Sequence, residues 1–488
     1  MIDIKTRIHG RFTLECKFSY KVRRKLKRNA FWVNMWVFVP NSLDINASTY
    51  ERADFYKDIR SYIRLITPVF LLREMVSGTA LPLKNLSASM SQLATQPTRS
   101  HVAAYEYQIK MFSVIFKRAL HNHMEYVCDA LGQNGVLGLI EEFLDHTQDI
   151  LNKYKQLAHV IQTPTVSSEY FNYYLFGYEF MSNIAEKVLY RTIVRLEKEA
   201  PDLAKSVAPR ILEMLEQERQ YKIQHHFLVV DAQKPQQNND LVFRLSALKK
   251  YVESDLFLDA KKKRDGFLAE QVYYSIAAGL SMIFATAIAF MFQLRYGNFT
   301  IPLFVALVVS YMLKDRIKEL MRYYFAHKKS ARYFDNKTKV SMMDREIAVS
   351  KEGFDFVPES KLPPEVLKVR NRIPLIAADN RYANEKIILY RKMVEIDRDV
   401  LSQSTNYQID GIVEIMRFNL MSFLRKTDDP EFPLYLPDGE GSVKQYMATR
   451  NYYLNIVLQW PQDDGLECRR YRVALNRNGI CDMKEVPT

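Results

Sequence analysis

The sequence predicts an α+β membrane protein with a two-span transmembrane helical hairpin, a cytoplasmic all-α helical-bundle domain and an α+β C-terminal domain. Three observations lead to this fold class. Residues 272–294 contain no charged side chain. Residues 48–259 keep a helical spacing of apolar residues, and strand-like segments occur near both ends of the chain. The N-terminal and C-terminal strand sets both look too small to fold alone, which leaves open that they pair with each other.

The segment Val272–Leu294 carries the membrane prediction. At about 1.5 Å per residue a helix of this length reaches roughly 35 Å, enough for a hydrocarbon core of about 30 Å. The next apolar segment, Ile301–Leu313, is shorter, so it either spans fully or is re-entrant. Thr300 and Pro302 suit the start of a helix, which favours a second span. The alternative is a soluble hairpin buried in a large globular core.

The basic residues predict the orientation of the two segments. Eleven lysines and arginines flank them on one side, whereas the connection between them holds only Arg295. The positive-inside rule therefore places both long flanking parts, and both termini, on the cytoplasmic side of an inner or plasma membrane. We expect these side chains to contact the membrane surface, chiefly Lys261, Lys262, Lys263, Arg264, Lys314, Arg316, Lys318 and Arg322, followed by Lys328, Lys329 and Arg332.

Small residues recur at a spacing of four on both apolar segments. Such faces let two helices approach closely in lipid. Packing within the hairpin is the simpler interpretation, and a seam between subunits is the alternative. The predicted helix-packing residues are Ala277, Ser281, Ala285, Ala289, Ala306 and Ser310.

Length and composition limit the number of domains and the kinds of partner. The 488 residues have room for two or three domains, and the formal net charge is +13. Much of the positive excess lies in residues 21–28 and 314–332. Because the second cluster adjoins the membrane segments, anionic lipid headgroups explain the basic balance better than nucleic acid does. The four cysteines lack metal-ligand spacing, and a cytoplasmic location predicts reduced thiols even for Cys468 and Cys481, which a hairpin could bring together.

The order of these segments predicts four parts. They are an N-terminal β-rich segment over 1–46, a cytoplasmic α-helical domain over 47–260, the transmembrane hairpin with its basic flanks over 261–334, and a cytoplasmic α+β domain over 335–488. In the helical domain we expect long helices over 101–131, 136–162, 167–199 and 201–226. In the last part, the spacing over 412–424 favours a helix, and residues 350–353 resemble a hairpin turn.

No catalytic, cofactor-binding or metal-ligating residue is predicted, because the sequence has no nucleotide-binding, hydrolase, metalloprotease or EF-hand motif. Two pairs, His121 with Glu125 and Glu142 with His146, have a spacing that could hold a metal in a bundle. The helical wheel turns both pairs away from the seam between their helices, which favours solvated ion pairs. His123 lies on the apolar stripe, where a hydrogen-bonded core histidine is the simpler expectation.

Charged groups near the C-terminus suggest one further site. Arg470 and Arg472 would share one face of a strand and form an anion-binding patch, or else they protect an edge strand. The acidic pairs 428–429 and 463–464 lie in loops, where turn formation is a sufficient explanation.

These observations leave three hypotheses of function. The leading one is a non-enzymatic scaffold or sensor that presents a helical partner surface at the membrane. The first alternative is a two-span effector that oligomerises and perturbs the bilayer, and the second is a membrane-tethered enzyme that uses the C-terminal domain. The expected partners are a bilayer with anionic headgroups and a protein partner or a second copy of the chain. Nucleic acid is not an expected partner, and no cofactor is expected.

Overall fold

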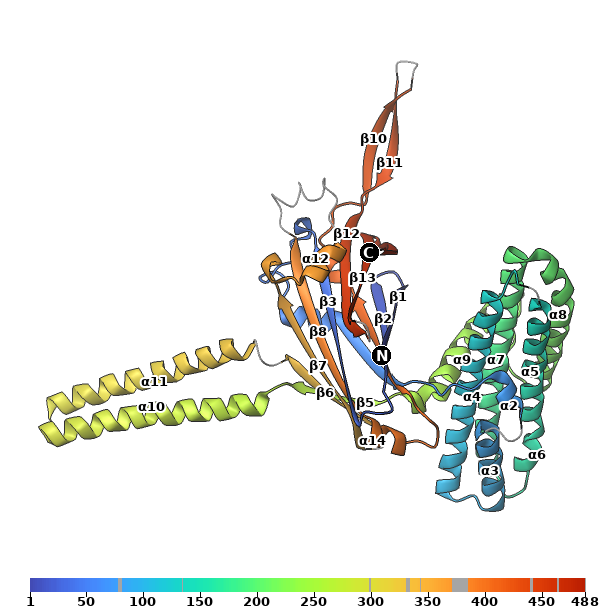
Figure 1. Ribbon diagram of the computed structural model, residues 1–488, viewed down its shortest axis with the longest axis horizontal. Helices are drawn as coiled ribbons and strands as arrows, with labels where there is room; N and C mark the ends of the chain where they lie inside the picture. The colour runs from blue at the N-terminus through green and yellow to red at the C-terminus, as the bar shows by residue number, and fades with distance from the viewer. Residues whose placement is uncertain are drawn as a thin grey trace. The chain divides into compact units, whose positions relative to one another are not determined.

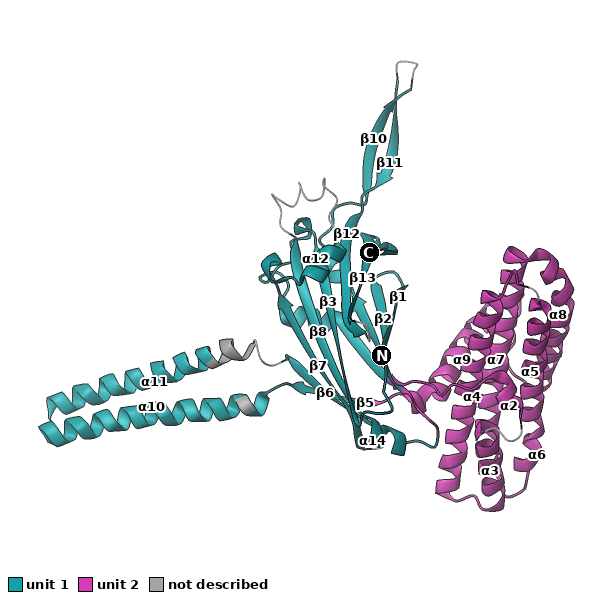
Figure 2. Cartoon of the chain, in the orientation of Figure 1, with its two compact units in different colours: residues 1–63, 259–406, 411–488 teal, residues 64–258, 407–410 magenta. Residues whose placement is uncertain are grey.

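A computed structural model describes residues 1–77, 81–133, 135–297, 300–330, 334–342, 344–370, 385–438, 442–462 and 465–487. The chain divides into two compact units (Figure 2). Unit 1 contains residues 1–63, 259–406 and 411–488, and unit 2 contains residues 64–258 and 407–410. The fold is a mixture of helix and sheet, as expected for an α+β protein (Figure 1).

Unit 1 is built on two antiparallel sheets. The larger has the strand order β14-β13-β12-β3-β8-β7-β6-β5, and the smaller has the order β1-β2-β9-β4. The strands of the larger sheet are β3 (Arg28–Val39), β5 (Asp259–Arg264), β6 (Asn336–Met342), β7 (Arg345–Phe356), β8 (Lys386–Asp397), β12 (Tyr452–Gln462), β13 (Gly465–Asn476) and β14 (Gly479–Val486). Those of the smaller sheet are β1 (Ile2–His9), β2 (Thr13–Lys21), β4 (Ile59–Leu65) and β9 (Gly411–Asn419).

The N-terminal strands lie inside these sheets. β3, whose C-terminal half is almost continuously buried, pairs with β8 on one side and with β12 on the other. β2 pairs along its whole length with β9. The N-terminal and C-terminal strand sets therefore form one unit rather than two domains, and residues 48–63 join the same unit with α1 (Arg52–Asp58) and most of β4.

Aromatic side chains fill the space between the two sheets. Phe55 of α1 contacts Phe354 of β7, Tyr390 of β8 and Phe418 of β9, with ring centroids 4.4, 5.4 and 5.8 Å apart. Buried aromatic rings of this kind supply much of the apolar area that holds a fold together. The contacts of Phe55 therefore tie both sheets and α1 into one core.

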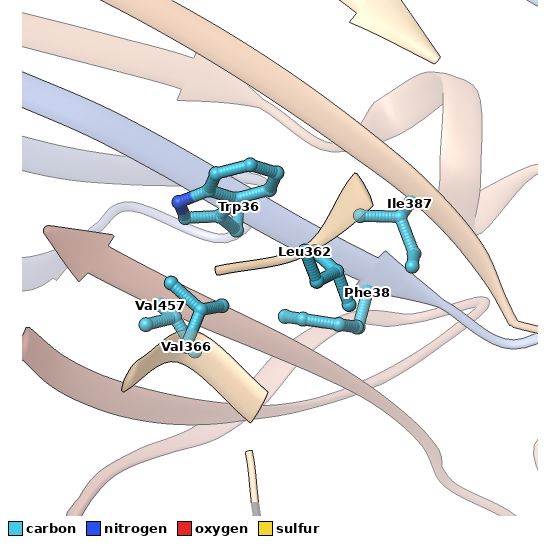
Figure 3. Close-up of a cluster of buried hydrophobic side chains, with 6 residues drawn as sticks. All are labelled: Trp36, Phe38, Leu362, Val366, Ile387 and Val457. Carbon is cyan, nitrogen blue, oxygen red and sulfur yellow. The ribbon is translucent and has the colours of Figure 1, made fainter. Parts of the chain in front are cut away.

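A second apolar cluster lies where α12 (Pro364–Arg370) covers the larger sheet (Figure 3). Its side chains come from three adjacent strands and from the segment around α12. They are Trp36, Phe38, Ile387, Val457, Leu362 and Val366. The shorter elements of unit 1 are η1 (Asn41–Leu43), η3 (Glu359–Lys361), α14 (Arg398–Gln403), α15 (Met421–Leu424) and the hairpin of β10 (Glu431–Pro437) and β11 (Val443–Thr449).

Two expectations about local structure are wrong, and the pairing of Cys468 with Cys481 across a hairpin does not occur. The segment 412–424 forms strand β9 followed only by the short α15, because β9 is buried on both faces and an apolar run of that kind has no diagnostic period. Residues 350–353 lie inside the continuous strand β7 and make no turn. Cys468 pairs in register with Gln459, and both Cys468 and Cys481 are free thiols.

Gly411 is needed where β9 begins beside β2. Its φ is +147°, and a Cβ built there would lie 1.9 Å from the Tyr20 carbonyl oxygen. Only glycine tolerates this approach of two backbones. The start of the β2–β9 pairing therefore depends on this residue.

Unit 2 is a helical bundle. Its helices are α2 (Leu72–Val76), α3 (Leu81–Thr95), α4 (Arg99–Asp129), α5 (Val136–Gln156), α6 (Ala158–Ile161), α7 (Ser168–Glu199), α8 (Pro201–Gln224) and α9 (Pro235–Glu253), followed by η2 (Ser254–Leu256). The long helices lie close to the ranges that their apolar spacing predicts.

Tyrosines join α5 to α7 in the bundle core. Tyr154 and Tyr174 stack with centroids 4.8 Å apart, and each hydroxyl donates to the other residue's carbonyl oxygen at 3.1 Å. Gly177 allows this close packing, because a Cβ there would lie 2.6 Å from the Tyr154 hydroxyl. Since a buried tyrosine hydroxyl needs a hydrogen-bond partner, the reciprocal bonds satisfy both groups.

Candidate functional site: the α10–α11 hairpin

Two long antiparallel helices, α10 (Phe267–Tyr296) and α11 (Ile301–Ser330), run side by side (Figure 1). Among the described residues, α10 is the one helix long and apolar enough to cross a membrane by length and composition. The apolar part of α11 ends at Leu313, after which charged residues begin with Lys314.

Small side chains lie between the two helices. Ala277, Ser281, Ala306 and Ser310 are buried there. The Ser310 hydroxyl donates to the Ala285 carbonyl oxygen at 3.1 Å, which is a direct contact across the helix pair. Ala285 and Ala289 are half-buried. The structure thus brings the predicted small-residue faces of the two helices together within one chain.

Large apolar side chains point outward from the same helices. Leu294, Ile301 and Ile283 are 89%, 81% and 66% exposed. Others that are exposed on the two helices include Val272, Ile276, Leu280, Met282, Phe290, Met291, Phe304, Val305, Leu307, Val308, Val309 and Met312. In a water-soluble protein this distribution would be reversed, because large apolar residues are the ones most favoured inside.

Two contacts set the register of the helices. Ser310 bonds Ala285, and the Arg322 guanidinium carbon lies 5.1 Å from the centroid of the Tyr274 ring. Both contacts fit one antiparallel alignment, in which Leu313 lies level with Met282. The part where both helices are apolar is therefore about 20 Å long at ~1.5 Å per residue. On the side of the hairpin nearer strands β5 and β6, the charged half of α11 lies beside residues 272–281 of α10.

Strand pairing ties the two ends of the hairpin together. β5 leads into α10, β6 follows α11, and the two strands pair in register from Asp259 with Ser341 to Arg264 with Asn336. The Asp265 amide also donates to the Asp335 carbonyl oxygen at 3.2 Å. The basic run 261–264, expected to contact the membrane surface, thus forms an edge strand of the larger sheet.

The predicted membrane-surface residues have different surroundings. Arg264 lies 3.5 Å from the Glu270 carboxylate, and Lys262 contacts Glu352 and lies over the Tyr56 ring. On α11, Lys314 lies over the Tyr311 ring and Arg316 pairs with Glu319 at 3.4 Å, while Lys318 is half-exposed. The side chains of Lys328 and Lys329, and Arg332 as a whole, lie outside the described residues.

A charged cluster lies buried between the two sheets, and the sequence analysis missed it. The Lys392 ammonium group pairs with Glu414 and lies 3.9 Å from Glu352, whose carboxylate also accepts a hydrogen bond from the Tyr390 hydroxyl at 2.8 Å. Burial and the neighbouring carboxylates raise the pKa of Tyr390 well above its usual value. The available signal was that Lys392 and Glu414 each have apolar or aromatic residues two positions away on both sides, which is the pattern of a buried strand face.

Arg470 and Arg472, the residues of the suggested anion patch, contact different side chains. Arg470 donates to Asn455 at 3.0 and 3.1 Å, whereas Arg472 lies over the Tyr453 ring. Burial, together with the charges of Arg370 and Arg472, lowers the pKa of Arg470. Asp429 pairs instead with Arg477 at 3.2 Å. Among the described residues no ion pair joins Asp429 to Arg470 or Arg472, and Asp463 and Asp464 lie outside the described residues.

The histidine and glutamate pairs of the bundle are also separate. His121 makes its contact with the Lys117 carbonyl, while Glu142 lies 3.7 Å from His146. Half-buried His123 lines a pocket of about 440 Å³ together with Phe70, Leu72, Arg73, Tyr126 and Glu142. Burial lowers its pKa. Nowhere in the described ranges do three or more histidine, cysteine or acidic side chains gather as a metal site would require.

The β10–β11 hairpin carries a second group of exposed apolar side chains. In its register Phe432, Leu434 and Tyr446 lie on one face, and all three are exposed. Tyr435, Met447 and Val443 are exposed on the other face. A two-stranded hairpin is at best marginally stable by itself in water, and an exposed apolar surface of this kind is uncommon on such an element.

Comparison with models of protein families, with curated proteins and with solved structures finds no match to this chain.

Proposed function

We propose that this chain is an integral membrane protein of the cytoplasmic membrane, held by the α10–α11 hairpin with both termini in the cytoplasm. In this proposal the β-rich unit and the helical bundle act as a non-enzymatic scaffold or sensor at the membrane surface.

The observation that carries the proposal is the inverted distribution of side chains on the hairpin. Small residues such as Ala277 and Ser310 lie between the helices, and large ones such as Ile283 and Leu294 lie outside. In lipid, helices associate through close packing of small residues, because the surrounding chains solvate the large ones. The register supports insertion of the closed end, with Lys314 and Lys318 extending to the headgroups.

Partner binding is supported by the exposed apolar surface of β10–β11. Phe432, Leu434 and Tyr446 form an exposed apolar face, on which the Arg450 guanidinium carbon lies 4.8 Å from the Phe432 ring centroid. The helical bundle offers a second surface, where Val242 and Phe243 of α9 are exposed. Either surface would be presented to cytoplasmic proteins by the anchored chain.

The test compares membrane retention of the full chain with that of two double variants. Ile283→Asp with Val308→Asp places two charges in the shared apolar part, where each costs about 2.5–3.5 kcal/mol in a bilayer. This variant should leave the alkali-resistant membrane fraction. Val194→Asp with Val242→Asp changes equally apolar, exposed residues of the bundle and should remain in it. A wild-type chain that is soluble without detergent would overturn the proposal.

A second candidate function is an oligomeric effector that perturbs the bilayer. Leu268, Val272, Ile276 and Leu280 are exposed at a spacing of four on α10, level with the charged half of α11. Lipid contact there would bring charges toward the hydrocarbon, so a second copy could cover the stripe instead. Expression of residues 260–335 alone discriminates the two functions. Permeabilised or poisoned cells would favour the effector, and harmless insertion would favour the scaffold.

A further inference from the structure

Five lysines share the outer face of the β5–β6–β7 edge of the larger sheet. Directly paired residues of adjacent strands point to the same side, and residues two apart on one strand do so too. Lys261 pairs with Lys339, while Lys263 pairs with Lys337, which in turn pairs with Lys351. The two rows therefore lie side by side on one face.

This face is the solvent side of the sheet. The alternate positions of β6 and β7, Val340, Ala348 and Ser350, are buried. In contrast, Lys339 is exposed, and Lys337 and Lys351 are half-exposed. All residues of β5 are exposed, as expected for an edge strand. The five lysines, named here the lysine face, are thus available to a partner.

The chain itself neutralises only part of the lysine face. Lys339 pairs with Glu346 at 2.6 Å, and Lys351 lies 4.0 Å from Asp265. Within the described residues no carboxylate lies within ion-pair distance of Lys261, Lys263 or Lys337. Like charges directly opposite each other destabilise a sheet. The arrangement therefore favours an external anion that bridges the rows.

Lys262 provides an internal comparison. It lies on the same strand but on the opposite face, where it pairs with the Glu352 carboxylate and lies 4.6 Å from the centroid of the Tyr56 ring. The lysine on the inner face of β5 is thus paired with a carboxylate of the chain, whereas Lys261 and Lys263 on either side of it are not. The unmatched charge belongs to one face and is not a general property of the strand.

We propose that the lysine face binds the headgroups of anionic lipids. This proposal rests on the proposed membrane anchorage. Only two residues separate the end of β5 at Arg264 from the start of α10 at Phe267. A bilayer that holds α10 would bring headgroup phosphates and carboxylates to the adjoining strands. Phosphate groups accept charge-assisted hydrogen bonds from ammonium groups, and each lysine near an anionic surface favours binding about fivefold.

The first experiment measures lysine acetylation in the full chain, by mass spectrometry, after reconstitution into lipid nanodiscs. Nanodiscs of pure phosphatidylcholine are compared with nanodiscs that contain 30 mol% phosphatidylserine, a composition chosen here to be roughly that of an anionic leaflet. We expect Lys261, Lys263 and Lys337 to react about fivefold more slowly in the anionic discs, with recovery at high salt. Lys5 and Lys368, which are exposed elsewhere, should react equally in both.

The second experiment replaces by glutamine the three lysines that lack a carboxylate partner in the described residues. It then measures how the chain partitions between neutral and anionic vesicles of different density. The variant Lys261→Gln, Lys263→Gln, Lys337→Gln should lose at least tenfold of the wild-type preference. A control of equal charge, Lys5→Gln, Lys368→Gln, Lys484→Gln, should keep it. Equal acetylation in both kinds of disc, or protection by duplex DNA but not by anionic lipid, would overturn the inference. Failure to reconstitute in any bilayer would instead overturn the anchorage.

Discussion

At the scale of single residues, unit 1 contains a buried charged cluster whose members need one another as partners. They are Lys392, Glu414 and Glu352. Lys392 and Glu414 come from β8 and β9, which belong to different sheets. Both side chains are almost inaccessible to water. Charges in such a place are tolerated because they are paired and hydrogen-bonded.

Lys392→Met should destabilise unit 1 by about 3–5 kcal/mol, because it leaves the Glu414 charge buried without its cation. Unfolding by urea can be followed by tryptophan fluorescence, since all three tryptophans lie in unit 1. Lys5→Met, on the exposed side of β1, should change the midpoint little. The double variant Lys392→Met with Glu414→Leu should recover much of the loss. A double variant as unstable as the single one would contradict this account.

Glu352 gives the cluster a pH dependence. Burial alone would raise its pKa, but the charges of Lys392 and Lys262 outweigh burial, and the pKa is lowered. A carboxylate with a lowered folded pKa stabilises the fold above its unfolded pKa, and this is lost as the pH falls through the folded value. Glu352→Gln should therefore destabilise unit 1 at pH 7, and the difference should shrink below about pH 4.3. Glu395→Gln, on the exposed face of β8, serves as the control in urea titrations at each pH.

At the scale of elements, the hairpin shows how a spacing of four becomes a contact. The four small residues of α10 lie on one face, and Ala306 and Ser310 continue that face on α11. The antiparallel register places Ala289 level with Ala306 and Ala285 level with Ser310. Local sequence predicts each face, but the register in which the two faces meet follows from the connection between the helices.

Ala285→Leu should loosen the hairpin, because added bulk at a close approach typically costs about 1–3 kcal/mol. We expect less inserted protein in a membrane fractionation. Ile283→Leu, at an outward position, should be tolerated. Equal tolerance of both variants would mean that the small-residue face is exposed to lipid. Normal insertion of A285L with loss of cross-linked oligomers would instead make that face a seam between subunits.

At the scale of the whole molecule, the connection between α10 and α11 decides the topology. The basic residues that flank the hairpin predict that only the short segment from Arg295 to Thr300 approaches the far side. Both units then lie on the cytoplasmic side. This arrangement would make the exposed apolar surfaces of β10–β11 and α9 available to cytoplasmic partners.

In a cysteine-free background, an impermeant thiol reagent applied to intact cells should label Asn298→Cys. It should not label Ser246→Cys or Ser402→Cys, both of which are exposed residues of the two units. Permeabilised cells should show labelling at all three positions. Labelling of Ser246→Cys or Ser402→Cys in intact cells would invert or abolish the proposed topology. Labelling of Asn298→Cys only after permeabilisation would indicate a re-entrant hairpin.

The sequence by itself determined the features that depend on neighbouring residues. The apolar run 272–294 and the long helices of unit 2 follow from composition and a period that each segment carries alone. The tertiary structure decided the features that depend on distant segments. β9 is a strand because β2 pairs with it, and Lys392 is buried because β9 supplies Glu414. The lysine face exists only because the register of β5, β6 and β7 turns residues far apart in sequence to one side. No local period encodes such a register, since it is set by the pairing of whole strands.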